Sequence, residues 1–167
     1  QDRLLRTLLR SFSTAFVSIA AVMALALRSW RMGLLAIVPN LIPVLVMLGT
    51  MGWAGIALDV ATVTVASIAF SVVVDDTIHF LHAYREGREA GMGAGASIAA
   101  LLDRSGRAMI AVSCVSGLSF LGFLGSPFVP LRDFGLLTSL TFGLGLLCDL
   151  ALLPALLLAF SREDGNA

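Results

Sequence analysis

Charge is scarce in this sequence, and lysine is missing altogether. Only 13% of the 167 residues are charged, and the eleven basic residues are all arginine, without a single lysine. The formal net charge is zero, so the chain lacks the basic field that nucleic-acid binding requires. We therefore expect no nucleic acid among its partners.

Cysteine and histidine are also rare, with two of each. Cys114 and Cys148 stand in apolar stretches without another Cys or a His at metal-ligand spacing, where a thiol behaves as a small apolar side chain. The sequence presents no catalytic, cofactor-binding or metal-binding motif. We expect neither enzymatic activity nor a bound cofactor or metal.

Long apolar runs, in contrast, fill most of the chain. Hydrophobic residues make up 58% of it, and the mean hydropathy is +0.95. Each of five runs approaches the roughly 17 to 25 residues that a helix needs to cross about 30 Å of hydrocarbon. The sequence predicts an all-α, polytopic membrane helix bundle with five transmembrane helices, at about residues 11–27, 33–53, 57–81, 107–126 and 134–159.

The segments between and beyond these runs complete the expected organisation. Residues 1–10 are the end of a region outside the membrane, and residues 161–167 form a tail on the inner side. A Gly-rich connection follows the third span and leads into a short amphipathic helix, about 94–104, expected on the inner surface. Because the chain opens on Gln1 and a basic amphipathic run, we expect it to be the C-terminal piece of a longer protein.

The distribution of the arginines distinguishes between the two possible orientations of the chain in the membrane, since loops on the inner side carry an excess of basic residues. With the N-terminus outside, four arginines lie outside and seven inside. The seven are Arg28, Arg31, Arg85, Arg88, Arg104, Arg107 and Arg162. This distribution favours an outer N-terminus and an inner C-terminus.

The third predicted helix carries a polar stripe. At 100° per residue, the side chains within about 80° of Asp75 are Thr64, Ser67, Ser71, His79 and His82. Asp76 lies about 100° to one side. Ten residues of about 1.5 Å each separate Asp75 from Arg85, which puts Asp75 near the membrane mid-plane. An ionised side chain there costs about 2.5 to 3.5 kcal/mol, so the acids call for a functional reason.

Two further helices have faces of small or weakly polar residues. The fifth span aligns Gly135, Thr138, Phe142, Gly145 and Asp149, and the fourth aligns Gly106, Ser113, Ser116 and Gly117. Such faces let helices approach closely. The simplest packing turns both faces and the polar stripe toward one another. In the second span, Pro39 and Pro43 flank Asn40, which is expected to bond a carbonyl that a proline leaves without its donor.

Carboxylates with hydroxyls above and imidazole below have the chemistry of a proton wire. Burial and mutual repulsion of adjacent acids both favour proton binding. The candidate relay residues are Asp75, Asp76, His79, Asp149, Ser113 and Ser116. The alternative for Asp149 is a plain helix–helix hydrogen bond, and for the two serines it is packing.

Four segments together resemble a known superfamily. They are IVPNLIPVLVMLGTMGWAGIALD, ASIAFSVVVDDTIHFLHAYREG, GRAMIAVSCVSGLSFLGFLGS and PLRDFGLLTSLTFGLGLLCDLALLPALL. The chain resembles, from about Leu4 to Phe160, the C-terminal membrane half of resistance-nodulation-division (RND) transporters, in the hydrophobe-exporter subgroup that includes the MMPL proteins. The most specific element is the acid followed by TIHF and YRE.

This resemblance implies a twelve-helix protein of two similar halves in the bacterial inner membrane, with large periplasmic domains. The five spans would be helices eight to twelve, and proton flux would move lipid-like or hydrophobic substrates outward. The implied partners are the lipid bilayer, the N-terminal half of the same transporter, the hydrophobic substrate and, in some arrangements, further copies of the chain. Asp75 matches the family's proton-coupling acid. Asp76 replaces a common Tyr, which leaves open which acid carries the proton.

Two other classes compete with this interpretation. Sec-type protein-export subunits would match Asp76 instead, but their Tyr-Ser-Ile-Asn-Asp lead and Phe-Asp-Arg exit are absent here. A sterol-sensing type of domain binds lipid and regulates without pumping. The acids argue against it, because lipid binding alone does not need them.

Overall fold

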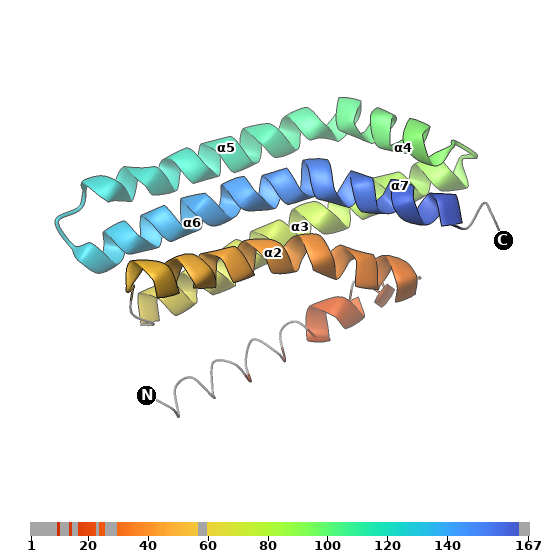
Figure 1. Ribbon diagram of the computed structural model, residues 1–167. Coiled ribbons are helices and arrows are strands. Elements are labelled where there is room, and N and C mark those ends of the chain that lie inside the picture. The colour runs from red at the N-terminus through yellow and green to blue at the C-terminus, as the bar shows by residue number, and fades with distance from the viewer. Residues whose placement is uncertain are drawn as a thin grey trace.

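The computed structural model describes residues 10, 14, 17–22, 24, 25, 30–56 and 60–163, and this described part is helical apart from short turns (Figure 1). Its elements are α2 (Trp30–Ala54), α3 (Val60–Glu89), α4 (Ala94–Leu101), η1 (Leu102–Gly106), α5 (Arg107–Leu121), η2 (Gly122–Gly125), α6 (Val129–Leu147), η3 (Cys148–Leu152) and α7 (Leu153–Glu163). The all-α class is confirmed. Most of the expected first span, 11–27, lies outside the described residues, as do 1–9 and 164–167.

Three helical stretches are long and apolar enough to cross a membrane: Met32–Ala54, Ala94–Gly125 and Val129–Ser161. They contain almost all of the second, fourth and fifth expected spans. The third expected span falls in α3, whose 30 residues extend about 45 Å. The crossing of α3, like that of the first span, stays a prediction.

The fourth span and the helix before it form one continuous stretch. Instead of a break near residue 104, the chain passes from α4 into α5 through the π-helical turn η1, whose flanking residues keep right-handed helical backbone. A π turn holds one extra residue and changes the direction of the helix, as Figure 1 shows between α4 and α5. The position of α4 on the inner surface stays a prediction.

A second π turn, η3, joins α6 to α7. Pro154, two residues after the end of this turn, has no backbone N–H to donate to the preceding turn, which disturbs regular α-helical bonding there. Asp149 lies within η3. Turns of this type are frequent at functional sites.

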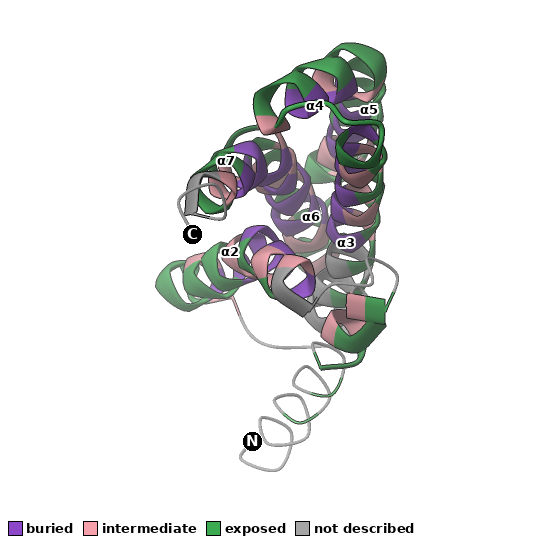
Figure 2. Cartoon of the chain, turned by 90° about the vertical axis from the view of Figure 1, so that its right-hand side faces the viewer, coloured by how far each residue is buried: buried purple, intermediate pink, exposed green. Residues whose placement is uncertain are grey.

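Helix α6 is the centre of the bundle, with α2, α3 and α5 packed around it, and α7 continues the line of α6 beyond η3 (Figure 2). Two glycines allow the close contacts. A Cβ at Gly135 would collide with the Phe120 backbone carbonyl on α5, and one at Gly145 would lie 2.5 Å from Val73 Cγ2 on α3. Phe120 also stacks on Phe142, with ring centroids 5.8 Å apart.

The continuous stretch Ala94–Gly125 gives a direct test of topology. Its 32 residues extend about 48 Å, so single cysteines at Gly93 and Ser126 are expected to react with a membrane-impermeant maleimide from opposite sides. Cys114 and Cys148 are replaced by alanine beforehand. Labelling of both positions from one side would contradict the crossing.

Candidate functional site

A buried polar cluster joins three segments of the bundle. Thr77 Oγ1 on α3 donates to Asp149 Oδ1 of η3 at 2.7 Å and lies 3.3 Å from Asn40 Oδ1 on α2. The side chains of all three residues are 2% exposed or less. Asp149 falls 20 residues into the candidate span that begins at Val129. The cluster therefore places hydrogen-bonded polar side chains inside the apolar part of the protein.

Local sequence explains how the cluster forms. Gly145 lies one helical turn before Asp149, and Val73 lies one turn before Thr77. Because Gly145 lets Val73 approach so closely, the next turn brings the threonine hydroxyl within hydrogen-bond distance of the carboxylate. Asn40 is carried by the helix that contains Pro39 and Pro43.

Asn40 does bond a backbone carbonyl, but this carbonyl is not one that a proline leaves without its donor, so the expected partner was wrong. Its Nδ2 donates to the carbonyl of Ala36 at 2.6 Å. The donors missing at Pro39 and Pro43 would have served the carbonyls of Leu35 and Pro39, four residues earlier. The amide of Asn40 therefore fixes its own side chain, with Oδ1 directed to Thr77.

Asp149 has more accepting capacity than its described neighbours fill. Its Oδ2 is buried without a hydrogen-bond partner among the described residues. Leaving a buried polar atom unpaired costs about 1 to 3 kcal/mol, and more when it carries charge. Such a carboxylate is a natural place for a proton to bind.

The polar stripe of α3 is not buried against the other helices, which corrects the expected packing. Ser67, Ser71, Asp75, His79 and His82 are all exposed, and the side chain of Thr64 lies outside the description. The face of α3 turned inward is Val73, Thr77, Phe80, Leu81 and Tyr84. The reason is that α6 offers mainly apolar and small side chains, which pair better with this second face than with ionised groups.

The faces of the fourth and fifth spans do turn inward, as expected. Gly135, Thr138, Phe142, Gly145 and Asp149 are buried on the fifth, and Gly106, Ser113 and Gly117 are buried on the fourth, with Ser116 half-buried. None of the described hydrogen bonds joins Ser113 or Ser116 to an acid. Their part in a relay stays a prediction.

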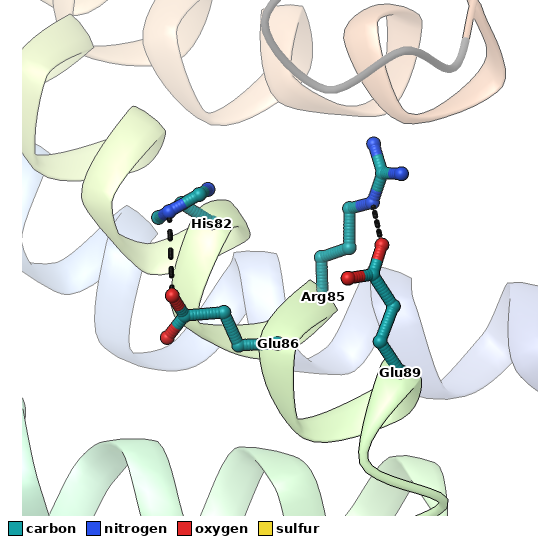
Figure 3. A network of polar contacts seen from close by, with 4 residues as sticks. All are labelled: His82, Arg85, Glu86 and Glu89. Atoms are coloured by element: carbon teal, nitrogen blue, oxygen red, sulfur yellow. Dashed lines mark hydrogen bonds and ion pairs between the residues drawn. The ribbon is translucent and has the colours of Figure 1, made fainter.

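Along the exposed stripe and beyond it, ionisable groups pair at one-turn spacing. His79 Nε2 lies 3.8 Å from Asp75 Oδ1, and their side chains are 77% and 72% exposed. Further along, His82 Nε2 lies 3.4 Å from Glu86 Oε1, and Arg85 Nε donates to Glu89 Oε1 at 2.6 Å (Figure 3). Pairs this exposed contribute little to stability.

Asp76 takes a different environment from Asp75. It is half-buried and lines a groove of about 540 Å³ between α3 and the α4–α5 stretch. His79, His82 and Glu86 continue along the α3 wall of this groove, and Arg104 and Ser105 stand on the opposite wall. Asp76 directly precedes Thr77, the residue that donates to Asp149. The groove thus leads from the Glu86 end of α3 to the neighbourhood of the buried cluster.

Sequence reasoning found Asp149 but missed Thr77 and Asn40 as its neighbours. In the sequence, Thr77 stands directly after the two acids and Asn40 between the two prolines. The signal was present as an uncharged polar residue on the apolar face of a helix. Such a residue needs a hydrogen-bond partner inside the bundle.

Long apolar helices that enclose a buried acid define a multi-pass α-helical membrane protein. The chain belongs to the MMPL family, within the RND superfamily, because the model of that family matches residues 4–166. It is also similar to MJ1562 of Methanocaldococcus jannaschii, which is named as a membrane protein, with 29% identity over 158 residues. That match covers 92% of this chain and 40% of the relative's length.

Proposed function

We propose that this chain is the proton-coupling part of an exporter that uses the proton-motive force to move lipids or other hydrophobic compounds outward across the cell membrane. The observation that carries the proposal is Asp149, an acid buried in a candidate span and hydrogen-bonded to a neighbouring helix. One elementary charge that moves down a potential of 100 mV releases about 2.3 kcal/mol. That is enough to bias two arrangements of helices when protonation changes the bonds of an acid.

The exposed stripe of α3 supports a second set of helices in the complete transporter. An acid and two imidazoles exposed to lipid would be costly, so a polar face of this kind requires a polar partner. We assign that role to the N-terminal half of the same transporter. Asp75, paired with His79, would then lie at the contact between the two halves and exchange protons there.

The groove beside α3 supports an inner-side route to the acids. Glu86, His82 and His79 follow one another along it toward Asp76, and imidazole passes protons readily near neutral pH. Asp76 would relay protons between this route and the buried acid. Hydrophobic substrate would bind in parts of the transporter beyond the coupling helices.

The competing functions fit these observations less well. Membership of the MMPL family favours a hydrophobe exporter over a Sec-type protein-export subunit. A buried acid whose Oδ2 has no partner within the described part of the chain favours a transporter over a lipid-binding regulator of the sterol-sensing type, because lipid recognition does not need it. The archaeal relative leaves the cell membrane, rather than a bacterial inner membrane in particular, as the proposed location.

Transport by the full-length protein tests the proposal. We would reconstitute it in phosphatidylethanolamine–phosphatidylglycerol liposomes that contain trapped pyranine and fluorescent NBD-phosphatidylethanolamine. An imposed pH gradient is expected to drive proton flux together with movement of the NBD lipid between leaflets, and an uncoupler is expected to stop both. Lipid movement at an unchanged rate without a gradient would contradict proton coupling.

A further inference from the structure

The hydroxyl of Thr77 has one hydrogen and three acceptors in reach. Its Oγ1 lies 2.7 Å from Asp149 Oδ1, 3.0 Å from the carbonyl of Val73 and 3.3 Å from Asn40 Oδ1. A single hydroxyl donates one hydrogen and accepts through its lone pairs. Which acceptor receives the hydrogen therefore depends on what Asp149 itself can donate.

Consider first the ionised form of Asp149. The carboxylate accepts the hydrogen of Thr77, because hydrogen bonds to a charged acceptor are the stronger ones. The distance of 2.7 Å to Asp149, against 3.3 Å to Asn40, fits this form. Asn40 Oδ1 then receives no hydrogen from Thr77, and the bond between α3 and α2 at this point is lost.

Consider next the protonated form. A hydrogen on Asp149 Oδ1 is donated to Thr77 Oγ1, and the hydrogen of Thr77 then turns to Asn40 Oδ1, because the carbonyl of Val73 already has a backbone donor within α3. The amide of Asn40 already donates to the carbonyl of Ala36. The result is one continuous chain of hydrogen bonds with the same direction throughout, from Asp149 through Thr77 and Asn40 to the backbone of α2. Chains of this kind strengthen each of their bonds.

We propose that Thr77 is a positioning residue that turns its hydroxyl from Asp149 to Asn40 when Asp149 gains a proton, so that α2 is bonded to α3 in the protonated form alone. The inference rests on the proposed proton exchange at Asp149. The hydroxyl of Thr77 would convert that proton exchange into a change of contact between α2 and α3. Protonation alters which bonds are available, and this difference is what shifts a two-state equilibrium.

The titratable surroundings of Asp149 are few among the described residues. Asp76 on α3 directly precedes Thr77, the partner of Asp149, and Cys148 precedes Asp149 on η3. From α2 the facing group is the neutral Asn40. A pH response of the cluster therefore involves Asp149 together with Asp76, and the test separates the two by substitution.

Infrared difference spectroscopy tests the switch without any transport measurement. Full-length protein in liposomes would be titrated between acid and alkaline pH. The carboxylic C=O band that disappears in Asp149→Asn but remains in Asp76→Asn would be assigned to Asp149. In Thr77→Val, which keeps the shape without the hydroxyl, that band is expected to move to higher wavenumber because its hydrogen bond is gone. Asn40→Leu is expected to move it in the same direction by less.

Two controls make the result specific. Thr77→Ser restores a hydroxyl and is expected to return the band to its original position, even if Thr77→Val lowers stability. Thr141→Val removes another buried hydroxyl, one that donates only to its own helix at Leu137, and is expected to leave the band unchanged. A shift in Thr77→Val with both controls as expected supports the switch.

The opposing outcomes are equally definite. An unmoved band in Thr77→Val, no band assignable to Asp149, or a band that responds to sodium at constant pH would overturn the switch. The proposed export function is judged separately by the NBD-lipid assay. Lipid export with an unmoved band would reject the switch alone, and a shifted band without gradient-driven lipid movement would reject the function alone.

Discussion

Asp75→Asn in the full-length protein is expected to abolish gradient-driven movement of NBD-phosphatidylethanolamine while the protein still inserts and folds. The amide keeps the shape of the carboxyl group but does not bind a proton at physiological pH. Asp75 is 72% exposed on a face with no covering helix among the described residues, so its replacement disturbs no core packing. The measurement is NBD-lipid movement and pyranine response in liposomes, with expression and thermal melting checked for the variant.

Two further variants make this result interpretable. Glu89→Gln removes an exposed acid near the end of the same helix, one that pairs with Arg85, and is expected to leave transport unchanged. Asp76→Asn is expected to leave partial activity, since Asp76 lines the groove beside the buried cluster. Full activity in Asp75→Asn together with complete loss in Asp76→Asn would reverse the roles of the two acids. It would favour the resemblance to Sec-type protein-export subunits, which match Asp76.

The helices themselves were predictable because the signal for a membrane span is strong. Twenty or so consecutive apolar residues have few alternatives to a spanning helix. The second and fifth expected spans, 33–53 and 134–159, fall within Met32–Ala54 and Val129–Ser161. The π turns η1 and η3 were not predicted. They depend on local backbone hydrogen bonding, such as the missing donor at Pro154, which does not change the hydropathy pattern.

The inward faces of the fifth and fourth spans were predictable for a related reason. Small residues repeated on one side of a helix mark the side where another helix comes close, and Gly145 and Gly135 make such contacts. The direction of the α3 stripe was not predictable in this way. Periodicity groups Ser71, Asp75 and His79 on one face, but it does not say whether the polar partner of that face lies in the same chain.

The pairing of Thr77 with Asp149 shows the same limit at the level of the site. Sequence separates the two by 72 positions, and threonine on an apolar face has an ordinary alternative, a bond to its own helix. Thr138 and Thr141 on α6 take that alternative. What distinguishes Thr77 is the acid that faces it across the contact, and only packing brings the two together.

Gly145→Ala is expected to lower the free energy of unfolding by about 1 to 3 kcal/mol, the usual cost of inserting an extra group into a packed interior. The new Cβ would lie 2.5 Å from Val73 Cγ2. Val73 is 4% exposed and β-branched, so it has little freedom to move aside. The helices α3 and α6 must separate, which also weakens the bond of Thr77 to Asp149 one turn further along.

Gly143→Ala is the matched control, because it makes the same change on the same helix at a position with nothing within 4 Å of the new Cβ. It is expected to leave stability unchanged or slightly raised, since alanine favours a helix over glycine. Thermal unfolding of the full-length protein in detergent micelles gives the comparison. In a double-mutant cycle, Val73→Ala is expected to cost less in the Gly145→Ala background than in the native protein, since it relieves the collision there. Equal melting temperatures for Gly145→Ala and Gly143→Ala, or additive effects in the cycle, would show that this contact does not set the spacing of the two helices.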